Sequence, residues 1–255
     1  MISERPSERA FFGASALLFA ASTVATIVWC SSMNATRGMP MPGNWTMSMA
    51  WMRMPGQTWP AAAATFLGMW MVMMVAMMLP SLVPMLRRYR HALARTGVTH
   101  LGSRTFAVAA GYFAVWAVFG MAIFPAGVAL ATVEMHRPAL ARAVPFAAGV
   151  VVLIAGMVQL SAWKRDQLAC CNDVPMRGGA WRHGLRLGLR CCSCCGDLTA
   201  ILLVAGVMDL GVMALVTTAI TLERVGPVPA WLPRATGGVV VATGVFLIVR
   251  AAGVV

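Results

Sequence analysis

Charged residues are scarce in this chain of 255 residues. Lysine, arginine, aspartate and glutamate make up 11% of it, whereas ordinary soluble domains contain about 25%. Hydrophobic residues make up 60%, and the mean hydropathy is +0.77. Because so little charge cannot cover a water-exposed surface, the composition predicts an integral membrane protein. The expected fold is all-α, a polytopic bundle of transmembrane helices.

The motifs of several large function classes are also missing. The sequence contains no P-loop and no G-x-G-x-x-G motif following a strand, so neither kind of nucleotide site is predicted. No segment suits a separate soluble domain, and residues 1–255 are expected to form a single membrane domain. The net charge of +12 requires no nucleic-acid partner, since basic loops beside a lipid bilayer account for it.

Six apolar segments are long enough to cross about 30 Å of hydrocarbon. A shorter apolar segment, 212–222, cannot span alone at about 1.5 Å per residue. We expect it to extend the fifth span beyond a break near 206–211 or to form a half-helix, and it makes a seventh span if counted separately. The six spans are 11–29, 61–83, 106–132, 144–163, 187–209 and 235–253.

Basic residues alternate in density between successive connections. Segments 84–104 and 164–190, together with the two ends of the chain, contain fourteen of the twenty lysines and arginines. Cytoplasmic loops are enriched in these residues, so we predict six spans with both termini in the cytoplasm. In this arrangement a first helix at 1–33 precedes an outward, methionine-rich loop at 34–60. The helical bundle then covers 61–255 and includes a cysteine-containing cytoplasmic loop at 164–190.

Methionine is concentrated in one part of the chain, with thirteen of its twenty-one copies between Met33 and Met78. Thioether sulfur is a soft, uncharged ligand that suits Cu(I), but methionine also fills gaps between packed helices. Within the second span, methionines recur at helical spacing in two neighbouring stripes. The methionines of the preceding loop favour a ligand role for those in the span, namely Met73, Met74, Met77 and Met78.

Four cysteines, Cys191, Cys192, Cys194 and Cys195, occupy five consecutive positions. On a helix, the first and the last two share one face, and Cys192 lies further round. Three or four thiolates on one turn predict a soft-metal site for Cu(I), Zn(II) or Hg(II). The spacing is not that of a zinc finger, and a vicinal disulfide with a redox role is an alternative.

Other side chains are candidates for the same site. Cys170 and Cys171, in the preceding loop, are candidate ligands, and Asp197 is an intramembrane carboxylate that either forms an ion pair or joins the metal shell. Glu223 and Arg224 are expected to form an interfacial ion pair.

Three motifs follow one another along residues 60–225. They are W-x2-M-x2-A-M-M-x-P at 70–80, Q-L-[TS]-x2-K with a cysteine pair and a proline at 159–175, and C-x2-C-C, G-x-M-[ND]-L and an acidic–basic pair at 191–224. Together they resemble a bacterial family of predicted metal-binding integral membrane proteins, a domain of unknown function. The resemblance implies metal binding without an established activity. This chain departs from the pattern at Gln167, where a loop cysteine is expected, at Gly196, where a tryptophan usually follows the cysteines, and at Cys192, which is additional.

The leading hypothesis is a multi-pass protein of the bacterial cytoplasmic (inner) membrane that binds a soft metal, with copper(I) favoured over zinc or mercury. It would move or hand over the ion between outward methionines and inward cysteines. Its expected partners are a metal ion or a metallochaperone. Two alternatives are a membrane thiol–disulfide oxidoreductase and a non-catalytic accessory subunit of a copper enzyme assembly. A homo-oligomer is compatible with each of them.

Overall fold

The computed structural model describes residues 4–35, 38–96, 100–172, 178–225 and 231–253. Eight α-helices occupy most of these residues, and six of them are long and apolar enough to cross a membrane. This confirms the all-α helical bundle. The six are α1 (Glu4–Ala35), α2 (Trp59–Ala94), α3 (Leu101–His136), α4 (Pro138–Leu160), α6 (Ala180–Ala205) and α8 (Trp231–Ala251), and the two shorter helices are α5 (Ala162–Asn172) and α7 (Leu210–Arg224).

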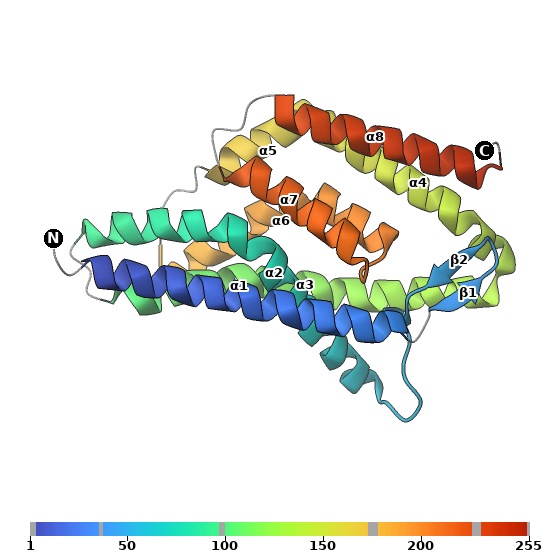
Figure 1. Cartoon of the computed structure of the whole chain (residues 1–255), viewed down its shortest axis with the longest axis horizontal. Helices are drawn as coiled ribbons and strands as arrows, with labels where there is room; N and C mark the ends of the chain where they lie inside the picture. Colours follow the sequence, from blue (N-terminus) through green and yellow to red (C-terminus); the bar gives the residue numbers. More distant parts are fainter. Residues whose placement is uncertain (1–3, 36–37, 97–99, 173–177, 226–230, 254–255) are drawn as a thin grey trace.

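The helices pack in pairs around the middle of the bundle. Helix α4 runs beside α8 along one edge, α3 packs against α6, and α1 packs against α2 (Figure 1). Helices α6 and α7 lie between the α4–α8 pair and the first three helices. Within its most apolar window α2 is 61% buried, more than any other span, so its methionines lie in the interior.

Two prolines bend α2 without ending it. Thr58 caps the helix by accepting a hydrogen bond from the Ala61 amide, and the helix continues through Pro80 and Pro84 to Ala94. Since proline removes a backbone donor and crowds the preceding turn, α2 changes direction partway along its length (Figure 1).

The break expected near 206–211 separates α6 from α7. Gly206 has φ of +123°, a conformation that favours glycine. Asp209 then caps α7, because its Oδ1 accepts hydrogen bonds from the amides of Gly211 (2.8 Å) and Val212 (3.0 Å). The turn sends α7 back alongside α6 as a half-helix of 15 residues (Figure 1).

This return sets the direction of the last helix, and the cytoplasmic location of both termini stays a prediction. Because α7 reverses the chain once more, α8 runs in the same direction as α1, and the two ends of the chain lie at opposite ends of the long axis (Figure 1).

Two segments expected to be loops contain regular structure. Segment 164–190 includes most of α5 and the first eleven residues of α6. Segment 34–60 contains an antiparallel hairpin of β1 (Met39–Met41) and β2 (Trp45–Met47) and a 3-10 turn at Met49–Trp51. The Trp45 indole donates to the Ala141 carbonyl at 2.8 Å and fixes the hairpin to α4. The periodicity of the flanking apolar runs did not indicate either feature.

Glycines bring α3 and α6 into close contact. A Cβ added at Gly111 would lie 2.6 Å from the Trp181 carbonyl oxygen, and one at Gly188 would lie 2.8 Å from that of Tyr112. At Gly184 an added Cβ would meet backbone atoms of α3. Small residues allow membrane helices to approach in this way, and the approach places the α3 side chains directly against the cysteine-bearing face of α6.

We therefore expect Gly184→Ala to lower the free energy of unfolding by about 1–3 kcal/mol, because a rigid backbone cannot move aside for the added methyl group. Thermal unfolding in detergent would measure the change. Gly68→Ala on α2 is the matched control, since nothing lies within 4 Å of its added Cβ. Equal stability of the two variants would contradict the close α3–α6 contact.

Candidate metal centre

Three cysteine sulfurs meet in the interior of the bundle. Cys191, Cys194 and Cys195 all lie on α6, and their Sγ atoms lie within 4.8 Å of one another. The Sγ of Cys195 is 3.9 Å from that of Cys191 and 3.5 Å from that of Cys194. All three side chains are at most 2% exposed. The i, i+3, i+4 spacing on one helix produces this arrangement, as the sequence predicted.

Arg224, at the last turn of α7, places a positive charge against this cluster. Its Nη1 donates to the Cys191 Sγ at 2.9 Å and to the Ser81 Oγ at 3.1 Å, and its Nη2 donates to the Met85 Sδ at 3.3 Å. The Tyr112 hydroxyl on α3 also donates to the Cys191 Sγ, at 2.9 Å. A guanidinium and a hydroxyl that both donate to one sulfur favour its thiolate form, which is the form that binds metals.

A second buried charge group lies beside the cysteine turn. Lys164 on α5 is fully buried, and its Nζ donates to both carboxylate oxygens of Asp197, at 2.9 and 3.1 Å. It also lies 3.5 Å from the Glu223 carboxylate and donates to the carbonyl of Cys194. The amide of Gln159 on α4 donates to Glu223. The network joins four helices around the residues that present the sulfurs.

The charge state of Lys164 follows from its neighbours. Burial by itself would lower the pKa of its ammonium, but the carboxylates of Asp197 and Glu223 outweigh that effect and hold the pKa above its ordinary value. Lys164 therefore stays protonated and neutralises part of the negative charge in the interior.

The other predicted site residues lie in different places. Cys192 is half-buried at the edge of the cysteine face. Cys170 and Cys171 belong to the last turns of α5, and their side chains lie outside the described part of the chain. The four predicted methionines of α2 are each at most 2% exposed and belong to the same hydrophobic cluster as the cysteines: Met73, Met74, Met77 and Met78.

Several residues of this centre were missed or misplaced. Tyr112, Ser81 and Met85 were not predicted, because no spacing in the sequence brings α2 and α3 to the cysteines. Glu223 and Arg224 were expected to pair with each other at an interface. That expectation was wrong: both are buried, and one faces Lys164 while the other faces Cys191. The motifs behind the family resemblance do contain Gln159, Lys164, Glu223 and Arg224.

The donor set fits a soft metal ion. Bonds of about 2.3 Å between metal and thiolate would set the sulfurs of a planar three-coordinate site about 4.0 Å apart, and the S–S distances of 3.5 and 3.9 Å are close to that value. Thiolates are soft ligands, and carboxylates are hard. The three sulfurs are therefore the candidate ligands for such an ion, and Asp197 is held by Lys164.

A comparison with protein families agrees with this chemistry. A family model described as PpoB2, copper chaperone, matches residues 67–247, about seven-tenths of the chain. Neither a curated protein nor a solved structure matches the chain. The matched region contains the cysteine cluster, Arg224 and the Lys164 network, and it begins after the loop at 34–60. The loop methionines therefore lie outside the part that defines the family.

We expect Lys164→Met to destabilise the protein by about 3–5 kcal/mol, because it leaves two carboxylates buried without their cation. Adding Asp197→Asn and Glu223→Gln to this variant should recover part of the loss, since those changes remove the unpaired charges. Thermal unfolding of the single and triple variants in detergent tests this coupling. Strictly additive losses would contradict the buried network.

Proposed function

This chain belongs to the PpoB2 copper chaperone family, and we propose that it binds Cu(I) at Cys191, Cys194 and Cys195 and passes the ion to an acceptor. In this proposal copper is cargo. The observation that supports it most directly is the meeting of three buried sulfurs within 4.8 Å, next to a guanidinium that stabilises negative charge on one of them.

The charge of the site is balanced when Cu(I) binds two of the three cysteines as thiolates and the third stays a neutral thiol. Cu(I) bound by two thiolates has a net charge of −1, and Arg224 supplies one compensating positive charge at the Cys191 sulfur. Lys164 is engaged by its own two carboxylates. Because an uncompensated buried charge is costly, a complex of Cu(I), two thiolates and one arginine suits this interior.

The methionines of α2 are proposed to form the approach to the cysteines. They lie in the buried core between the start of α2 and Met85, whose sulfur contacts Arg224. Thioethers bind Cu(I) without adding charge, so the ion can pass along them without burying further anions. Helix α2 meets the cysteine site mainly through Arg224 on α7, because α2 packs on α7 and α6 packs on α3.

A thiol–disulfide oxidoreductase has less support. Such an enzyme exchanges disulfides through attack by a thiolate that its partner can reach, and the three clustered sulfurs are at most 2% exposed. Burial of this kind suits a bound ion better than a large thiol partner.

We expect the purified protein to bind Cu(I), and the variant Cys191→Ser, Cys194→Ser, Cys195→Ser to lose at least about tenfold in affinity, because serine oxygen is a hard ligand. Competition with a chromogenic Cu(I) chelator under anaerobic conditions measures this affinity. Cys30→Ser is the matched control, since Cys30 is equally buried but lies against Met208 instead. Wild-type affinity in the triple variant would rule out the proposed site.

Replacing Met73, Met74, Met77 and Met78 together by leucine tests the approach route. Leucine and methionine have similar volumes, so stability should change little per site. We expect copper to bind the cysteines with wild-type affinity at equilibrium but to load more slowly in proteoliposomes. Unchanged loading rates would show that these methionines only pack.

A further inference from the structure

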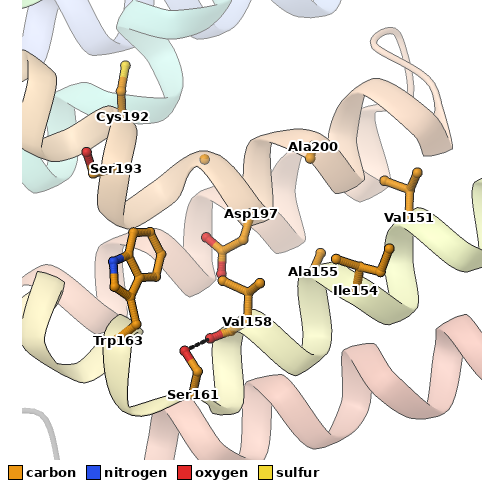
Figure 2. Close-up of a pocket in the computed structure, with 11 residues that line it drawn as sticks. Val151, Ile154, Ala155, Val158, Ser161, Trp163, Cys192, Ser193, Asp197 and Ala200 are labelled. Atoms are coloured by element: carbon orange, nitrogen blue, oxygen red, sulfur yellow. Dashed lines mark hydrogen bonds between the residues drawn. The ribbon is translucent and has the colours of Figure 1, made fainter.

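A groove runs along the side of α6 that faces away from the three clustered cysteines. It encloses about 630 Å³ and is lined by α4, the start of α5 and α6. Figure 2 shows Val151, Ile154 and Val158 along α4, Trp163 at the start of α5, and Asp197 and Ala200 on α6. The lining is mostly apolar, and Asp197, which also binds Lys164, contributes a carboxylate to it.

Cys192 lies at the boundary between this groove and the cysteine cluster. With about 3.6 residues per turn, it is some 60° around the helix from Cys195, and residues three apart on a helix are neighbours. Cys192 packs against the buried core on one side and lines the groove on the other. It is half-buried, whereas the three clustered cysteines are buried.

The groove is open at Gly196. Gly196 lines it, and nothing lies within 4 Å of a Cβ built on this residue. A tryptophan introduced there would project into this space. The open groove and the half-buried thiol of Cys192 therefore lie on the same stretch of α6.

We propose that Cys192 is the exchange ligand through which Cu(I) passes between the buried cysteines and the groove. This inference rests on the proposed copper site and assigns its route of exchange. In the step, a bond forms between Cu(I) and the Cys192 sulfur, and the bond to one buried sulfur breaks. The proton of the Cys192 thiol is transferred to the departing sulfur, and copper remains Cu(I). A thiol entering the groove then binds the ion in place of Cys192, and its proton returns to the Cys192 sulfur. A second thiol replaces the remaining buried sulfur in the same way, and its proton passes to that sulfur, which frees the ion as Cu(I).

Exchange kinetics with full-length protein in detergent test this role. The protein is loaded with Cu(I) under anaerobic conditions and mixed with a water-soluble chromogenic Cu(I) chelator, and both the extraction rate and the equilibrium affinity are measured. We expect Cys192→Ser to leave the affinity unchanged and to slow extraction about tenfold. Gly196→Trp should slow it in the same way by filling the groove. Ser193→Ala is the matched control in the groove and should exchange at the wild-type rate.

The outcomes separate the two proposals. A wild-type extraction rate in Cys192→Ser overturns the exchange role, and so does a loss of affinity in that variant, because Cys192 would then be a resident ligand. If wild-type protein holds no Cu(I), the proposed function itself fails. Slow extraction with unchanged affinity supports Cys192 as the exchange ligand, whether or not the tryptophan variant folds.

Discussion

The arrangement of the candidate metal centre depends on the ion pairs and the hydrogen bond of the buried Lys164 ammonium. The ammonium is completely enclosed, yet it binds Asp197 on α6, approaches Glu223 on α7 and donates to the Cys194 carbonyl. Breaking a buried ion pair leaves an uncompensated charge in a medium of low polarity, which is far more costly than losing a surface pair. The network therefore holds α5, α6 and α7 in one arrangement, and that arrangement brings Arg224, next to Glu223 in the chain, to Cys191.

The half-helix α7 carries Glu223 and Arg224 into the interior of the bundle. It is too short to span the bilayer alone, but it returns from the Gly206–Asp209 turn to the level of the cysteines. A charged residue on such a returning helix is not part of a span that crosses the hydrocarbon. It can therefore be buried among protein groups and kept away from lipid. The same return sets the direction of α8. The position of the C-terminus and the placement of Arg224 at the Cys191 sulfur therefore have one structural cause.

Copper handling requires a site that holds the ion firmly and still releases it. In the proposed function the three buried sulfurs of α6 would hold the ion, and in the proposed exchange the groove beside Cys192 and Gly196 would give access to it. One helix can serve both purposes because its turn places successive residues on different faces. Selectivity for a soft ion would then come from sulfur chemistry, and access would come from the absence of a side chain at Gly196.

The sequence by itself determined the membrane bundle, its six long spans, the break after the fifth span and the shared face of Cys191, Cys194 and Cys195. These features follow from local quantities: hydropathy, helical period, glycine and an N-terminal cap. Only the tertiary structure decided that Arg224 and Tyr112 bind the Cys191 sulfur, that Lys164 binds Asp197, and that α8 runs parallel to α1. Each of these depends on which faces of the helices pack against one another. The residues in contact are far apart in the chain, so no local pattern in the sequence indicates that they meet.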